Sequence, residues 1–287
     1  MNGVVRAMAF STLLAGLVVA NAGATPRPVT ETAQFGNVQA TLTYDYDPQA
    51  EDFRQTYTHL RLVIARAGTV VLDVAPQPVC ADCSTWQWSG GSSKSSAISV
   101  ADLDRNGEPV VLLDLYTGGA HCCVYTVFYR YDGTTYVTRR HDWGNPGYKL
   151  VDLGGDGVPE FLTRDDRFNY AFSCYACSGT PVRVFRVVRQ RLADVTRSFP
   201  SLVRRDAASL WRSYRSARRE RADPAGLLPA YVADEYLVGR GGPAWARLRR
   251  AVAVREWPKL VQDPRWRSRR RYEAAVRSFL RRTGYLR

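Results

Sequence analysis

The sequence lacks the common short motifs of catalysis. It contains no Gly-x-Ser-x-Gly, no His-Glu-x-x-His and no phosphate-binding loop, so no motif points to the hydrolase, zinc protease or nucleotide-binding chemistry that these patterns mark. Its three histidines, His59, His121 and His141, share no spacing. Beyond the N-terminal segment, no apolar stretch is long enough to cross a membrane. We therefore expect a mature protein that does not span a membrane and whose role does not follow from a catalytic motif.

The N-terminus predicts export. Arg6 precedes an apolar run from Ala7 to Ala20, and small residues follow as far as Ala24. This is the pattern of a secretory signal peptide cleaved after Ala24. We predict that residues 1–24 are the signal peptide and that the mature protein is secreted, periplasmic or held in the cell envelope.

Six cysteines in an exported chain predict disulfides, because that compartment is oxidising. A thiolate metal site that includes His121 is disfavoured by the same compartment. A disulfide oxidoreductase is a third interpretation, but neither Cys-x-x-Cys begins a helix within a recognisable βαβ pattern. Adjacent cysteines would be strained if joined to each other, so we expect this pair to bridge to the two Cys-x-x-Cys segments. The six residues are Cys80, Cys83, Cys122, Cys123, Cys174 and Cys177.

The net charge of +13 is unevenly distributed. Residues 201–287 hold 22 Lys and Arg against 8 Asp and Glu, a net charge of +14, whereas residues 1–200 have a net charge of −1. Such asymmetry suggests a separate element with an anionic partner. For an exported protein we expect a cell-envelope polymer or polysaccharide and not nucleic acid; the alternative is a solvated arginine face. The candidate anion-binding residues are Arg265, Arg267, Arg269, Arg270, Arg271, Arg281 and Arg282.

The chain changes character near residue 200. Up to that point, alternating segments such as Val38 to Tyr46 and turn signals such as Asp132-Gly133 predict antiparallel strands. After Phe199-Pro200 the apolar residues recur at helical spacing, and Asp206 can cap the first of four helices. We predict a β-rich domain at residues 25–199 and an Arg-rich helical domain at residues 200–287.

Two loops in the β-rich part repeat each other. Asp102-Leu-Asp-Arg-Asn-Gly-Glu-Pro and Asp152-Leu-Gly-Gly-Asp-Gly-Val-Pro start 50 residues apart, and each leads into an apolar run. Leu, Gly and Pro recur at matching offsets, which indicates a two-copy internal repeat. Oxygen-bearing side chains at the first, third and fifth positions of a sharply curved loop can surround a hard cation such as calcium.

Residues 95–190, with these two loops, resemble the FG-GAP/VCBS repeat family. The resemblance implies calcium held between strands of a propeller blade, with the carbonyls of Glu108 and Val158 as additional ligands. Each loop is one carboxylate short of the family pattern, because Val110 occupies the ninth position of the first loop and Gly154 the third position of the second. Calcium would therefore bind weakly, and the alternative is a turn that holds no ion. The side-chain ligands implied are Asp102, Asp104, Asn106, Asp152, Asp156 and Glu160.

Together these observations predict a mainly β protein followed by an α-helical C-terminal domain. Its antiparallel sheets would be propeller-blade-like or form a sandwich. The function that we predict is a non-enzymatic binding or scaffolding module, stabilised by calcium, with a basic helical face for an anionic cell-envelope partner. The alternative is an extracellular hydrolase of cell-wall or polysaccharide substrate, with acidic residues near the repeat loops as catalysts. A cleft that gathers His121, Asp165 or Asp166 would favour the enzyme, and dispersal of these residues or ion pairs with arginine would favour the binding module.

Overall fold

The computed structural model describes residues 25–51, 55–76, 86–87, 96–117, 123–189 and 191–286. The predicted signal peptide lies outside these residues, as do Cys80, Cys83, His121 and Cys122. Within the described ranges no helix has the length and apolar character needed to cross a bilayer.

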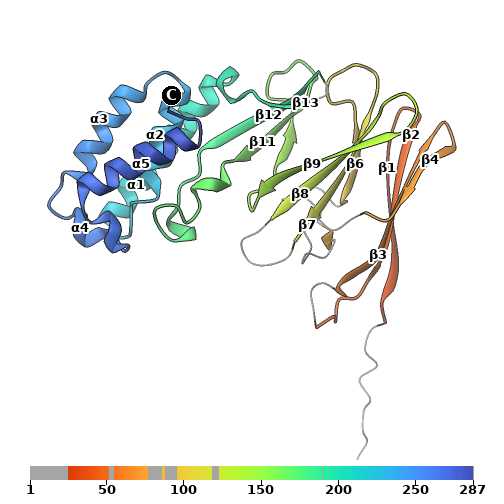
Figure 1. Ribbon diagram of the computed structural model, residues 1–287, viewed down its shortest axis with the longest axis horizontal. Coiled ribbons are helices and arrows are strands. Elements are labelled where there is room, and N and C mark those ends of the chain that lie inside the picture. Colours follow the sequence, from red (N-terminus) through yellow and green to blue (C-terminus); the bar gives the residue numbers. More distant parts are fainter. Residues whose placement is uncertain are drawn as a thin grey trace, which may run out of the picture.

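Three antiparallel sheets follow one another along the chain (Figure 1). The first sheet has the order β1-β2-β3-β4, the second β5-β7-β8-β9 with β6 also paired to β7, and the third β10-β11-β12-β13. No closed barrel or propeller is formed by the strands that the structure describes. The strands are β1 (Arg27–Phe35), β2 (Val38–Tyr46), β3 (Tyr57–Arg66), β4 (Thr69–Val74), β5 (Trp86–Gln87), β6 (Ile98–Ala101), β7 (Val110–Tyr116), β8 (Val124–Tyr131), β9 (Tyr136–Gly144), β10 (Lys149–Val151), β11 (Glu160–Arg164), β12 (Val182–Val188) and β13 (Arg191–Asp194).

The middle sheet is buried on both faces, and strand β7 shows why. Successive side chains of a strand point to opposite faces. Val111 and Leu113 of β7 pack in a core shared with β2 and β3 of the first sheet. Val110 and Leu112 pack in a second core with Phe161 of β11. The continuous apolar run of β7 therefore joins two cores, and the three sheets stack in a row.

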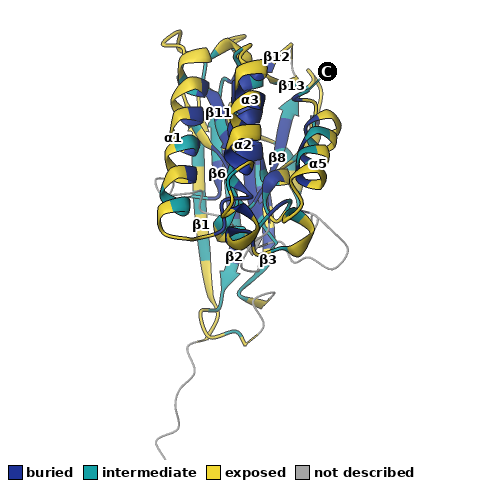
Figure 2. Ribbon diagram, turned by 90° about the vertical axis from the view of Figure 1, so that its left-hand side faces the viewer, coloured by how far each residue is buried: buried dark blue, intermediate teal, exposed yellow. Residues whose placement is uncertain are grey.

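Helices complete the molecule beyond the third sheet (Figure 1). Proline occupies the first turn of α1, where its missing N–H costs no helical hydrogen bond. The outer faces of these helices are exposed and their inner faces are buried (Figure 2). The helices are α1 (Pro200–Arg219), α2 (Leu227–Leu237), α3 (Gly241–Val252), α4 (Trp257–Leu260) and α5 (Arg269–Arg282), with single 3-10 turns η2 (Asp166–Phe168), η3 (Tyr175–Cys177), η4 (Thr196–Ser198) and η5 (Pro264–Trp266).

The helical core includes two residues from the β-rich part. Phe168 and Phe172 lie in the connection between β11 and β12, and both are buried among the helices. The ring of Phe172 contacts the ring of Tyr272, at 5.7 Å, and that of Phe279, at 5.3 Å between centroids. Sheet and helices are also joined by polar contacts, because Asp206 of α1 accepts a hydrogen bond from the backbone N–H of Val182 at 3.1 Å.

Candidate functional site

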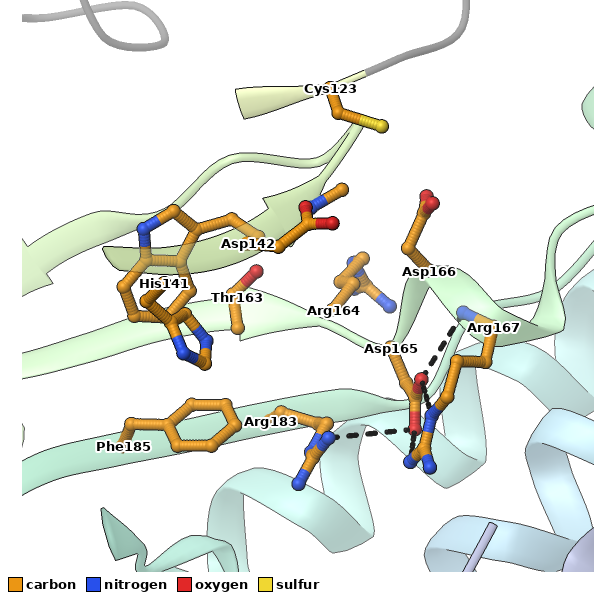
Figure 3. A pocket seen from close by; sticks show the side chains of 12 residues that line it. Cys123, His141, Asp142, Thr163, Arg164, Asp165, Asp166, Arg167, Arg183 and Phe185 are labelled. Carbon is orange, nitrogen blue, oxygen red and sulfur yellow. Dashed lines mark hydrogen bonds and ion pairs between the residues drawn. The ribbon is translucent and has the colours of Figure 1, made fainter. Parts of the chain in front are cut away.

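A cavity of about 490 Å³ opens between the second and third sheets (Figure 3). Its volume lies in the range of small-molecule sites. Its walls come from the residue before β8, the end of β9, the strands β11 and β12, and η2. The lining residues are Cys123, His141, Asp142, Trp143, Gly144, Thr163, Arg164, Asp165, Asp166, Arg167, Arg183 and Phe185.

Glycine is required where β9 ends beside this cavity. Gly144 has φ +67°, in the left-handed region that favours glycine. A Cβ at this position would lie 2.4 Å from the Cβ of Asp166. The close approach fixes Asp166 against the end of β9.

Asp165 is held by cations and does not face the cavity as a free carboxylate. Its side chain is 2% exposed and accepts hydrogen bonds from Nε and Nη2 of Arg167, at 2.7 and 2.5 Å. The hydroxyl of Tyr285, near the C-terminus, donates to it at 2.9 Å. Arg183 lies 3.9 Å away. The bidentate pairing and the third donor leave this carboxylate a structural role.

Asp166, the adjacent residue, turns the other way and lines the cavity (Figure 3). Burial raises its pKa, and the negative charges of Asp142 and Asp165 raise it further. Asn169 donates a hydrogen bond to its carboxyl group at 2.7 Å, which opposes that shift. The two adjacent carboxylates therefore do not form a catalytic pair.

His141 contributes an apolar wall to the same cavity. Its ring lies 4.2 Å from that of Trp143 and 5.5 Å from that of Phe185, both edge to face. Burial lowers the pKa of His141, so the ring is neutral at physiological pH. Sequence reasoning chose His121 and passed over His141, because only the pairing of β8 with β9 brings His141 to the sheet interface.

The two repeated loops have the same backbone structure. In the first, the Asp102 carboxylate accepts hydrogen bonds from the N–H groups of Asn106 and Gly107, at 3.2 and 2.9 Å. In the second, Asp152 accepts from three N–H groups, including that of Gly157 at 2.9 Å. Residues at the fourth and sixth positions have positive φ in both loops. The flanking strand pairs also match in register, so the internal repeat is present as two equivalent hairpins.

An arginine lies between two of the proposed calcium ligands in the second loop. Arg186 of β12 forms ion pairs with Asp156, at 3.1 Å, and with Glu160. The Glu160 side chain is 0% exposed, and it also accepts a hydrogen bond from the backbone N–H of Leu153 at 2.8 Å. The guanidinium therefore supplies the positive charge that a cation would bring to these carboxylates.

In the first loop, too, an arginine from a neighbouring strand pairs with an acidic side chain. Arg66 of β3 pairs with the side chain of Glu108, at 2.5 and 2.9 Å. Asp104, at the third position, takes no part in the hydrogen bonds that close the turn. Among the residues described, no group of three or more His, Cys, Asp or Glu is placed to hold a metal ion.

The cysteines are paired differently from our expectation. Cys174 and Cys177 form a disulfide with each other, because the single turn η3 brings their Cα atoms to 5.0 Å. The expected bridge from this segment to the adjacent cysteine pair is therefore wrong. Cys123 is also disulfide-bonded.

The seven candidate arginines do not cluster at one place on the surface. Arg265 is bound by Asp263, with its Nε and Nη2 at 2.8 and 2.6 Å from one carboxylate oxygen. Residues 269–271 lie in the first turn of α5 and residues 281–282 in its last. A helix of this length separates its ends by about 20 Å.

Sequence reasoning did not select a second arginine group, on α1. Arg212, Arg215 and Arg219 line a groove of about 380 Å³ together with Ser213 and Ser216. Their spacing of three and four residues places them on one stripe of the helix. That spacing is visible in the sequence and could have identified the group.

Comparisons with known proteins find similarity over parts of the chain. Residues 203–284 match a family model described as the sll0997 C-terminal domain. The probable thylakoid lumen protein sll0997 of Synechocystis sp. is 33% identical over 154 residues, 52% of this chain and 45% of that protein. The uncharacterized protein y4bJ of Sinorhizobium fredii is 28% identical over 212 residues, 68% of this chain and 33% of that protein. This chain thus spans less than half the length of these curated relatives. No solved structure matches it.

These matches overturn the resemblance to FG-GAP/VCBS repeats. The similarity is to the sll0997 C-terminal domain and to sll0997 itself. The resemblance of the two loops to calcium loops has a physical cause. The same Asp and Asn residues that surround calcium also close a tight turn by accepting backbone hydrogen bonds, as Asp102 and Asp152 do.

Proposed function

We propose that this protein is a non-enzymatic binding module outside the cytoplasm, whose arginine-rich helices bind an anionic polymer. The observation that carries the proposal is a contrast in pairing. Three buried carboxylates in and around the sheets are paired with arginines, namely Asp165, Glu160 and Asp206, whereas the arginines on the outer face of α1 have no carboxylate partner among the described residues.

Buried ion pairs with arginine involve acidic side chains that a hydrolase would otherwise use for catalysis. Asp165 is bound by Arg167, Glu160 by Arg186, and Asp206 by Arg164. Each carboxylate is at most 9% exposed at its side chain. A buried carboxylate that already accepts charge-assisted hydrogen bonds from a guanidinium is not free to contact a substrate. These pairs favour a structural role for the acidic residues.

The outer arginines are arranged for a polyanion. Arg212, Arg215 and Arg219 follow one stripe of α1 over about 10 Å. Ser213 and Ser216 line the same groove. A guanidinium binds a carboxylate, sulfate or phosphate through two parallel N–H groups. A stripe of such groups fits repeated anions along a polymer.

Two further observations support the location. The apolar N-terminal segment predicts export. A relative of this chain is described as a probable thylakoid lumen protein. Both are consistent with a non-cytoplasmic compartment, where the anionic partners are envelope polymers and polysaccharides.

The test is retention on immobilised dextran sulfate as salt rises from about 50 to about 500 mM, a range over which exposed charges become strongly screened. The variant Arg212→Gln/Arg215→Gln/Arg219→Gln should elute at clearly lower salt than the unaltered protein. The matched control is Arg61→Gln/Arg240→Gln/Arg265→Gln, which removes three arginines that already pair with carboxylates.

Equal losses in the two triple variants would contradict the proposal, because net charge alone would then explain retention. Retention that does not change with salt would contradict it as well. An elution shift confined to the α1 variant would support this stripe as the binding surface.

A hydrolase acting on polysaccharide is the second candidate, and one observation favours it. The cavity between the sheets holds Asp166, whose pKa is raised by burial, together with Asp142 and a neutral His141. A carboxyl with a raised pKa can act as a general acid. Loss of a measured polysaccharide-cleaving activity in Asp166→Asn, with binding to dextran sulfate unchanged, would favour this candidate over the binding module.

A further inference from the structure

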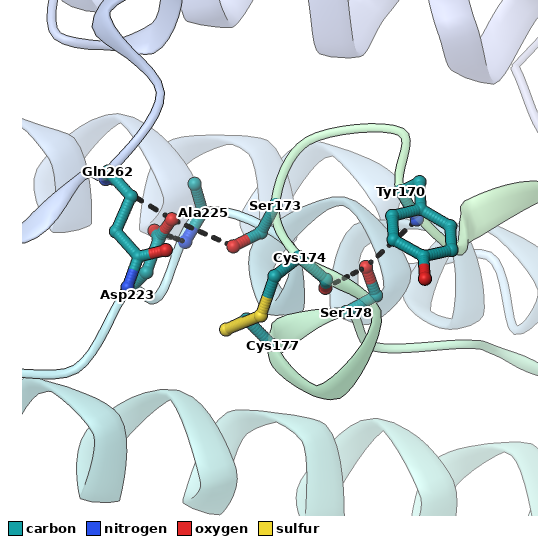
Figure 4. The surroundings of a disulfide bond; sticks show 8 residues. All are labelled: Tyr170, Ser173, Cys174, Cys177, Ser178, Asp223, Ala225 and Gln262. Carbon is teal, nitrogen blue, oxygen red and sulfur yellow. Dashed lines mark hydrogen bonds between the residues drawn. A yellow bond between two sulfur atoms is a disulfide. The ribbon is translucent and has the colours of Figure 1, made fainter.

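We infer that the Cys174–Cys177 disulfide is a thiol–disulfide exchange site for an external dithiol (Figure 4). Cys174 is exposed and Cys177 is partly exposed. Cys177 also lines a cleft of about 560 Å³ between η3 and α1. A nucleophile from solvent therefore has access to this bond, which is a requirement for exchange.

The bond is not needed to hold its loop in place. Ser173 donates a hydrogen bond to Asp223 at 2.7 Å, and the N–H of Gly179 donates to the carbonyl of Gly226 at 3.1 Å. Phe172, on the same loop, is buried among the helices. These contacts anchor both sides of the cysteine pair to the helical region.

The covalent ring is also small. Only two residues separate the cysteines, and the loss of chain entropy that a crosslink imposes on the unfolded state grows with the length of the loop that it closes. A bond that joins no distant segments contributes less in this way than a long-range disulfide. Its position and its short ring fit a reactive pair better than a structural staple.

The other described disulfide cysteine provides a contrast within the same molecule. Cys123 is disulfide-bonded and 9% exposed. It immediately precedes β8 and lines the cavity between the sheets. An external thiol should reach Cys174 far more readily than Cys123, because exchange depends on access to the sulfur.

Two tyrosines form the surface next to the exchange site. The rings of Tyr170 and Tyr175 lie 5.5 Å apart, and Tyr170 is 58% exposed with φ +58°. Its N–H donates to the hydroxyl of Ser178, which follows the disulfide. An exposed aromatic surface beside a reactive disulfide can contact the partner that carries the dithiol.

The exchange proceeds in two steps. One thiol of the partner loses its proton and attacks Sγ of Cys174; the disulfide breaks, and Cys177 leaves as a thiolate that takes up a proton. The second thiol of the partner loses its proton and attacks the partner's own sulfur in the mixed disulfide, which releases Cys174 as a thiolate that is then protonated. Two electrons pass from the dithiol to the cysteine pair, and the partner becomes a disulfide.

The test uses the oxidised full-length protein and dithiothreitol as the dithiol. Samples are quenched with acid over time, alkylated, digested and quantified by mass spectrometry. We expect Cys174 and Cys177 to become alkylated at least about tenfold faster than Cys123, as their accessibility requires. The far-ultraviolet circular dichroism of the protein should keep its native helical signal while they react. Alkylation of all three at one rate, or only as the protein unfolds, would overturn the inference.

Single variants identify the sulfur that is attacked. Cys177→Ser leaves Cys174 as a thiol, and Cys174→Ser leaves Cys177. Incubated with glutathione disulfide, the Cys177→Ser protein should form its mixed disulfide several-fold faster, because Cys174 is the more exposed residue. The opposite order would overturn the assignment of Cys174 as the exchange sulfur.

Discussion

Asp234 makes the stability of the helical region depend on pH in a direction opposite to that of most carboxylates. This residue of α2 is 0% exposed, and within the described part of the chain neither of its carboxyl oxygens accepts a hydrogen bond. Burial raises its pKa to about 10, and the neighbouring carboxylate of Asp206 contributes to the shift. Asp206 itself is bound by Arg164 at 2.8 Å.

The sign and size of the effect follow from proton linkage. An unfolded aspartate releases its proton near pH 4, whereas the folded protein keeps the proton on Asp234 until about pH 10. Between these values the folded state binds one more proton than the unfolded state, so the free energy of unfolding falls by about 1.4 kcal/mol for each pH unit. From pH 4 to pH 7 this group alone costs about 4 kcal/mol.

The substitution Asp234→Asn removes this proton while keeping the shape of the side chain. We expect the variant to be more stable than the unaltered protein at pH 7, with a difference that widens toward pH 9. Urea unfolding at pH 5, 6, 7, 8 and 9 measures it. The control is Asp132→Asn, because Asp132 is exposed and backbone hydrogen bonds lower its pKa. Parallel stability curves for the unaltered protein and Asp234→Asn would refute the reasoning.

Two predictions concern the repeated loops. Arg186→Gln should lower the free energy of unfolding by roughly 3 kcal/mol, because it leaves the buried carboxylate of Glu160 without its cation. Urea unfolding measures this loss, and adding Glu160→Gln should restore part of it. An Arg186→Gln protein as stable as the original would contradict the prediction. For calcium, we expect a rise in Tm that Asp104→Ala abolishes and Asp152→Ala leaves in place, since an arginine already occupies the second loop. Scanning calorimetry with calcium and then with a chelator measures this. If neither changes the Tm, the loops act only as turns.

Local features of the fold were predictable from the sequence. The alternating segment from Val38 to Tyr46 is a strand with those bounds, and Asp132-Gly133 forms the turn between two paired strands. Helices follow residue 199 as expected, but the first begins at Pro200 and not after Asp206. Periodicity and turn residues report what a segment does within a few residues of itself. Asp206 shows the limit, because a residue with the chemistry of a helix cap lies buried inside α1 and binds the third sheet.

The contacts of the site were not predictable in this way. Arg186 lies 26 and 30 residues from its two carboxylate partners, and the cavity gathers residues from three strands and a 3-10 turn. No local pattern encodes such contacts, because they arise from the register of the sheet and from the stacking of one sheet on another. The same limit explains why Asp165 and Asp166 could be proposed as candidates while their opposite environments could not.

The position of Phe168 and Phe172 has a consequence for how the helical region folds. The segment that is shared with the sll0997 C-terminal domain begins at residue 203, but its core is closed by two aromatic rings that precede it by more than 30 residues. Loss of one buried phenylalanine side chain typically costs 3 to 5 kcal/mol, about as much as the whole stability of a small domain. The segment that the family model matches is therefore smaller than the unit that folds, and a chain cut at residue 203 would lack both rings.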